Sequence, residues 1–166
     1  MGLPEMTTSV QRDTHPFREV VICRDEASRE YHKTLFSLQD DCYIRSDNLI
    51  ETILEISREG VSKLHITADW ENILKTALWS SDKPPISEVV ALIRKNGAGE
   101  DELQPFQNSD INDIFPWLYY ANRFDILRKI CNAAKSRIES KIDARKVLVY
   151  CHLVSSDISK IVASSL

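Results

Sequence analysis

The sequence predicts an α+β fold with a helical majority, in which a small two- to three-stranded sheet packs on five or more helices. Clear strand patterns are few, the best being the β-branched run 20–22 and the alternating segment 61–67. Most other apolar residues recur at three- and four-residue spacing, which is typical of helices. The chain has only 4 glycines, which disfavours a turn-rich β-sandwich or barrel.

The first half of the chain is expected to contain both strands and helices. Residues 1–16 are polar and aperiodic and are predicted to be a flexible leader. The strand at 20–22 is followed by a turn, and residues 30–31 are a candidate second strand. Ser46 is a good N-cap for a helix that Gly60 ends, and 61–67 is the third strand candidate.

The second half is expected to be helical. Asp69 can cap the cleanest amphipathic helix, which carries Leu74 on its apolar stripe. A loop is expected at 97–109. The other predicted helices cover residues 89–93, 111–119, 125–138, 143–151 and 158–162.

Composition excludes several classes of protein. Of the 166 residues, 43% are hydrophobic and 28% charged, so the chain can build a core. A formal charge of -4 argues against a surface that binds nucleic acid all over, although a local basic patch stays open. The sequence has no apolar run of the roughly 18–20 residues that a membrane span needs, and residues 1–14 do not resemble a secretory signal. We therefore expect an intracellular protein, cytoplasmic or nuclear, with reduced thiols.

Catalytic and metal-binding motifs are not evident. The sequence contains no Walker loop, no dinucleotide fingerprint and no Gly-x-Ser-x-Gly elbow. The four cysteines form no Cys-x-x-Cys pair, and the histidines at 15, 32, 65 and 152 are scattered along the chain. On a helix, Cys151 and His152 would point about 100° apart, which suits neither a metal site nor a catalytic dyad. The prediction is therefore a chain that is not an enzyme, with no catalytic, cofactor-binding or metal-binding residues, and an unrecognised enzyme is kept as a third possibility.

Aromatic residues gather at 115–124. Because aromatic side chains so close together on helices cannot all face one core, some are expected to line a second surface or a partner protein. Burial of all of them within one domain is an equally open alternative. The aromatic residues of this segment are Phe115, Trp117, Tyr119, Tyr120 and Phe124.

The order of these elements resembles a BTB/POZ domain. Residues 17–22 are similar to the first strand of that family, and 30–37, with His32-Lys33, resemble its second strand and the following helix start. The helices over 114–138 resemble its closing helical pair, and 142–148 is similar to the opening of the BACK helices that often follow. The resemblance divides the chain into a BTB/POZ-like domain at 17–140 and a short helical extension, a BACK-like start, at 141–166.

The resemblance implies a non-catalytic protein–protein interaction module that forms homodimers and serves as a substrate adaptor of a cullin-type ubiquitin ligase. Family members that bind cullins carry a hydrophobic-x-Glu element, which Ile53 and Glu55 match, although an ordinary core role for Ile53 is the alternative. Trp117, Tyr120 and Phe124 complete the predicted protein-interaction residues. The alternative function is a small helical nucleic-acid-binding or regulatory domain that uses the basic stretch 135–146. Glu139 and Asp143 dilute that stretch, so nucleic acid is the less favoured partner, and no membrane partner is expected.

Overall fold

A five-stranded sheet is the centre of the computed structural model, which describes residues 17–165. The strand order is β2-β1-β3-β4-β5. The first four strands are parallel, and β5 is antiparallel to β4. The predicted leader at 1–16 lies outside the described residues. The strands are β1 Glu19–Cys23, β2 Tyr43–Arg45, β3 Lys63–Ala68, β4 Leu148–Ser155 and β5 Lys160–Ser164.

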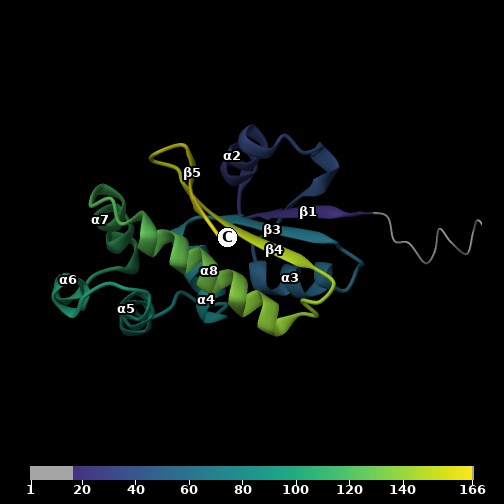
Figure 1. Ribbon diagram of the computed structural model, residues 1–166. Helices are drawn as coiled ribbons and strands as arrows, with labels where there is room; N and C mark the ends of the chain where they lie inside the picture. The colour runs from purple at the N-terminus through teal and green to yellow at the C-terminus, as the bar shows by residue number, and fades with distance from the viewer. Residues whose placement is uncertain (1–16, 166) are drawn as a thin grey trace, which may run out of the picture.

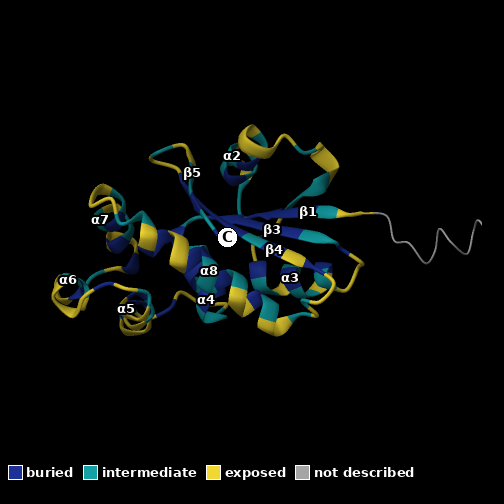
Figure 2. Ribbon diagram, viewed as in Figure 1, coloured by how far each residue is buried: buried dark blue, intermediate teal, exposed yellow. Residues whose placement is uncertain are grey.

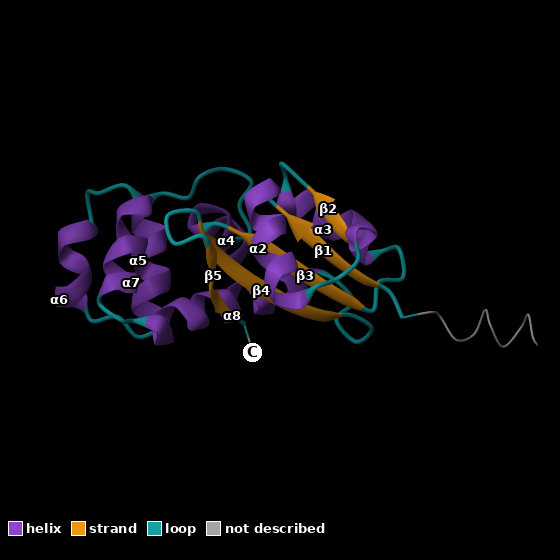
Figure 3. Ribbon diagram, turned by 90° about the horizontal axis from the view of Figure 1, so that it is seen from above, coloured by secondary structure: helices purple, strands orange, loops and turns teal. Residues whose placement is uncertain are grey.

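Helices cover the two faces of the sheet unequally. Helix α2 covers one face, while α3, α4 and α8 pack on the other, and α5, α6 and α7 extend past one end of the sheet (Figures 1 and 3). Within residues 17–165, none of the helices combines the length and the apolar character needed to cross a membrane. The helices are α2 Glu26–Phe36, α3 Leu49–Ser57, α4 Trp70–Leu78, α5 Ile86–Lys95, α6 Glu100–Leu103, α7 Ile114–Tyr120 and α8 Phe124–Lys141.

The predicted fold class is wrong: the sheet has five mostly parallel strands, and the fold is α/β. The main error lies at the C-terminal end, where helices were expected over 143–151 and 158–162. These segments form β4 and β5 and belong to the same sheet as β1 and β3. β4 is buried on both faces over most of its length, so its sequence shows a near-continuous apolar run instead of the alternation of a half-buried strand.

Smaller corrections concern single elements. Residues 30–31, predicted as a strand, lie within α2, whose N-cap Asp25 accepts a hydrogen bond from the backbone N–H of Ser28. The short edge strand β2 was not predicted, because three residues are too few to show a period. The N-cap of α3 is Asn48 and not the predicted Ser46, and the segment 97–109, predicted as a loop, contains α6. The strands near 20–22 and 61–67 are confirmed, as is the Asp69 N-cap of α4.

The main core lies between the sheet and α3, α4 and α8. Strand alternation sends Val20 and Ile22 of β1, and Leu64 and Ile66 of β3, into this core. Leu74 of α4 is fully buried there. Figure 2 shows that the middle strands are mostly buried while the outer surface of α2 is exposed. The opposite sheet face, here called the α2 face, presents Glu19, Val21, Cys23, His65, Thr67, Tyr150 and His152.

Candidate metal centre

Three histidines from three separate elements meet between α2 and the sheet. His32 comes from α2, His65 from β3 and His152 from β4, and their side chains are 0%, 2% and 2% exposed. Nδ1 of His65 lies 3.2 Å from Nε2 of His32 and 2.8 Å from Nε2 of His152. One ring nitrogen from each residue falls within 4.8 Å of the other two, which makes the group a candidate metal site.

The backbone pattern explains why these rings converge. In β3, Leu64 and Ile66 point into the main core, so His65 between them points to the α2 face. The register pairs Thr67 with His152, which places the His152 ring on that same face. His32 is a buried residue on the sheet-facing side of α2, one turn after the buried Ser28.

Each histidine is held through its second ring nitrogen. Nδ1 of His32 lies 2.8 Å from the Tyr43 hydroxyl, and Nδ1 of His152 lies 2.7 Å from the Ser164 hydroxyl. Nε2 of His65 lies 2.5 Å from a carboxylate oxygen of Glu19, which is also 3.7 Å from Nζ of Lys63. Histidine ligands of metal ions are commonly oriented in this way by an outer oxygen partner.

The hydrogen positions follow in part from these contacts. A carboxylate only accepts hydrogen bonds, so Nε2 of His65 carries the proton and its Nδ1 points a lone pair inward. That single lone pair can accept a good hydrogen bond from the N–H of His32 or from the N–H of His152, but not from both at once. The Tyr43 and Ser164 hydroxyls can also accept, and when both do so, three inward lone pairs face one another, an arrangement that a bound cation would stabilise.

Electrostatics keep the rings neutral. Burial, followed by the neighbouring His65, lowers the pKa of His32 to about 3. Burial, followed by His65 and His32, lowers the pKa of His152 to about 3. Burial also lowers the pKa of His65, although Glu19 opposes this shift. Neutral imidazole is the form that binds metal ions, so no proton has to be removed from a charged ring for binding at neutral pH.

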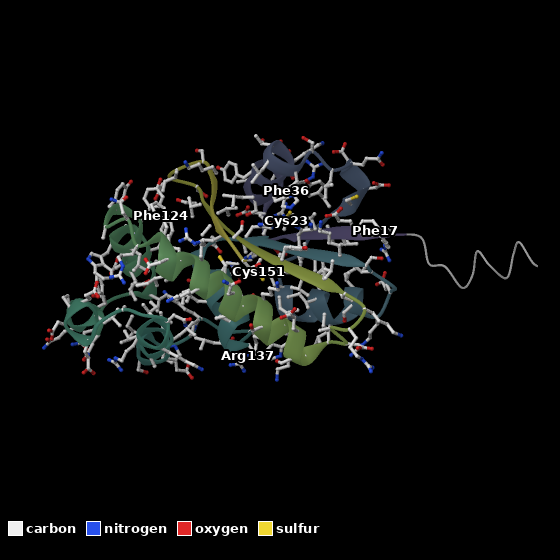
Figure 4. All side chains as sticks on the ribbon, viewed as in Figure 1. Phe17, Cys23, Phe36, Phe124, Arg137 and Cys151 are labelled. Carbon is white, nitrogen blue, oxygen red and sulfur yellow. The ribbon has the colours of Figure 1, made fainter. Side chains whose placement is uncertain are left out.

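The ring of Phe36 covers the cluster at the end of α2. It stacks on His32 with centroids 4.4 Å apart, and its centroid lies 5.5 Å from His65 and 5.1 Å from His152. Phe36 itself is 39% exposed, and Figure 4 places it on the α2 side of the sheet. An apolar ring between the imidazoles and solvent lowers the local dielectric, which strengthens a metal–ligand bond beneath it.

The predicted interaction residues do not form one surface. Ile53 is fully buried in the main core, so a partner can contact it only if α3 moves, while Glu55 on the same helix is exposed. Trp117 and Phe124 are half-buried against Phe106 and Tyr119 respectively. Tyr120 is 74% exposed and is the most accessible aromatic of the group. A protein-interaction role for these residues, dimerisation and cullin binding all stay predictions.

The basic stretch 135–146 is spread over different environments. Lys135 and Lys141 lie over the rings of Tyr150 and Trp79, and Arg145 pairs with Asp143. Several of its charges therefore already contact neighbouring side chains, and nucleic-acid binding there stays an untested alternative.

Sequence reasoning missed the histidine cluster. The ligand spacings, 33 and 87 residues, follow no short metal motif, because the sheet rather than a local loop brings the residues together. One signal was present: His65 interrupts an apolar strand on the face opposite Leu64 and Ile66. The matching signal at His152 was hidden because its segment was interpreted as a helix.

Comparisons with known proteins give one distant match. A cobalt-precorrin-5B C(1)-methyltransferase from Desulfotalea psychrophila is 25% identical over 140 residues. The alignment covers 80% of this chain, but this chain spans only 38% of that enzyme's length. No family model and no solved structure match the chain, so the resemblance to BTB/POZ domains stays a prediction. The prediction that the chain is not an enzyme is corrected, because the relative is an enzyme and points weakly toward catalysis.

Proposed function

We propose that this chain is a metal-binding α/β domain that holds one divalent transition-metal ion on His32, His65 and His152. Zn²⁺ is the favoured ion. The observation that carries the proposal is the convergence of three buried, neutral imidazoles, each oriented by an oxygen partner on its other nitrogen.

The distances support an ion of this size. In a tetrahedral site with Zn–N bonds of about 2.0–2.1 Å, neighbouring ligand nitrogens lie about 3.3 Å apart. The His32–His65 separation of 3.2 Å matches this value, the His65–His152 separation of 2.8 Å needs a small widening, and all three ligand nitrogens lie within 4.8 Å of one another. An all-imidazole ligand set favours zinc, copper, iron or nickel over Ca²⁺ and Mg²⁺, which prefer oxygen.

Three protein ligands leave one coordination position for water or another small ligand. Catalytic zinc sites have this ligand count, whereas structural sites are closed by four protein ligands. The ligand count therefore agrees with the distant match to an enzyme. Methyl transfer is the activity of that relative. The intracellular location predicted from the sequence stays a prediction.

Metal titration tests the proposal. Purified protein, freed of metal by a chelator, should bind one equivalent of Zn²⁺ by calorimetry. It should also give the visible absorption of a four-coordinate centre with Co²⁺. His65→Gln and His152→Gln should abolish both signals. His15→Gln is the matched control, since His15 is the histidine outside the described residues.

The outer partners give a second readout. Glu19→Gln should weaken Zn²⁺ binding by about 10–100-fold while the stoichiometry stays at one, which is the usual effect of losing an outer carboxylate. Failure to bind Zn²⁺ or Co²⁺, or binding that His65→Gln leaves intact, would show that the cluster is only a hydrogen-bonded histidine network.

A further inference from the structure

We propose that metal occupancy controls the docking of α2 on the sheet, so that the centre works as a metal-dependent clamp that opens the α2 face when the ion leaves. The proposal rests on the proposed metal binding and adds a regulatory consequence to it. It commits to a local event, in which α2 moves while the main core stays folded.

Helix α2 has little apolar contact to hold it in place. Its buried residues are Ser28 and His32, both polar. Its largest apolar side chains lie at its end, where Leu35 is 63% exposed and Phe36 39% exposed. Since helices of this length are marginal without an apolar face to bury, docking of α2 depends on the contacts of His32 and on the Phe36 ring, which lies against His65 and His152.

Polar groups under α2 further weaken its metal-free contact with the sheet. Among the described residues, the hydroxyls of Ser28 and Thr67 are buried without a hydrogen-bond partner, and each such group favours an open state in which water reaches it. The ion pairs of Arg29 and Lys33 with Asp40 join α2 to the short 3-10 helix before β2, not to the central strands. The shared carboxylate of Asp40 is 69% exposed, so solvent screens these pairs and weakens their contribution.

A metal ion would change this balance. His32 is the ligand on α2, whereas His65 and His152 belong to central strands that pair along their length. Binding at the three rings therefore joins the weakly held helix directly to two paired strands of the sheet. An ion that binds only when α2 is docked shifts the equilibrium between docked and undocked α2 toward the docked state. The size of the shift is set by the difference in the ion's affinity for the two states.

Cys23 is a built-in reporter for this motion. It lies at the end of β1, is 1% exposed and pairs in register with Thr67 on the α2 face. This register places the thiol on the face that α2 covers, where Arg29 and Glu26 of α2 are close enough to influence its ionisation. Cys131 and Cys151 are fully buried in the main core and report global unfolding instead. Figure 4 shows Cys23 and Cys151 in these separate positions.

Thiol alkylation with N-ethylmaleimide, mapped by mass spectrometry, tests the clamp in a Cys42→Ser background that removes the half-buried thiol. Cys23 should react at least about tenfold faster in the chelator-treated protein than with one equivalent of Zn²⁺, as expected for a local opening. Cys131 and Cys151 should stay protected in both samples. His32→Gln should leave Cys23 reactive even with Zn²⁺. Lys33→Ala, its neighbour on the helix, should keep the protection by zinc.

The outcomes separate the two proposals. Zn²⁺ binding with an unchanged rate at Cys23 overturns the clamp and leaves the metal centre standing. Equal acceleration at Cys23, Cys131 and Cys151 after metal removal also overturns the clamp, because the whole domain then unfolds. Absence of Zn²⁺ binding overturns both proposals.

Discussion

His65 is the residue on which the histidine cluster depends most. Both other rings contact its Nδ1, and its opposite nitrogen contacts the carboxylate of Glu19. Residue types alone could not reveal this arrangement. A single histidine in a strand can be a hydrogen-bonded core residue as easily as a metal ligand. The decisive information is which strands are neighbours in the sheet. In the sequence, 79 residues separate the end of β3 at Ala68 from the start of β4 at Leu148.

The buried histidines should make the metal-free protein sensitive to acid. His32 and His152 have folded-state pKa values of about 3, against an ordinary value of 6.5. Between these limits the unfolded chain binds more protons than the folded one, so stability falls as pH drops from 6.5 toward 3. In this pH range, each of the two histidines lowers the free energy of unfolding by up to about 1.4 kcal/mol for each unit that the pH falls.

Urea unfolding at pH 7, 6, 5 and 4 measures this loss. His152→Asn removes one titrating group, so its free energy of unfolding should fall less steeply with acid than that of the wild type. Equal slopes for the two proteins would show that His152 titrates normally in the folded state.

At the scale of elements, local signals decided which predictions succeeded. The α4 helix was predictable because a capping Asp69 precedes a five-residue apolar stripe, and both features act within a few residues. The strand β4 was not predictable, because a strand buried on both faces lacks the alternation of apolar and polar residues that would distinguish it from a buried helix. The cap Asp25 that starts α2 was also present, but the polar composition of that helix hid its period.

Leu74→Ala tests the α4 contact with the main core. Leu74 is 0% exposed, so truncation leaves a cavity between α4 and the layers around it. The expected cost is roughly 2–5 kcal/mol in the free energy of unfolding. Glu88→Ala, an exposed change on α5, is the control and should stay within about 0.5 kcal/mol of the wild type. An unchanged urea midpoint for Leu74→Ala would contradict the burial of this face.

At the scale of the whole molecule, the sheet order explains where the cluster can form. The order β2-β1-β3-β4-β5 is that of a common doubly wound sheet, here with an antiparallel edge strand. Three helices cover one face and build the main core, which leaves the other face to α2 and to polar side chains (Figure 1). The sequence supplied enough periodicity to place the helices of the crowded face. It could not supply the sheet order, because parallel pairing is a long-range property.

This layout predicts that the metal ion stabilises the whole domain and not only α2, because two of its ligands lie on central strands. An ion present at 100 times its dissociation constant adds about 2.7 kcal/mol to the folded state. For a domain of this size, that corresponds to a rise in Tm of roughly 5–10 °C. Differential scanning calorimetry with Zn²⁺ and with a chelator measures the shift, and Mg²⁺ should produce none. The His65→Gln variant should have the same Tm with Zn²⁺, with Mg²⁺ and with the chelator. A zinc-induced rise that persists in this variant would place the bound ion elsewhere in the chain and contradict the three-histidine centre.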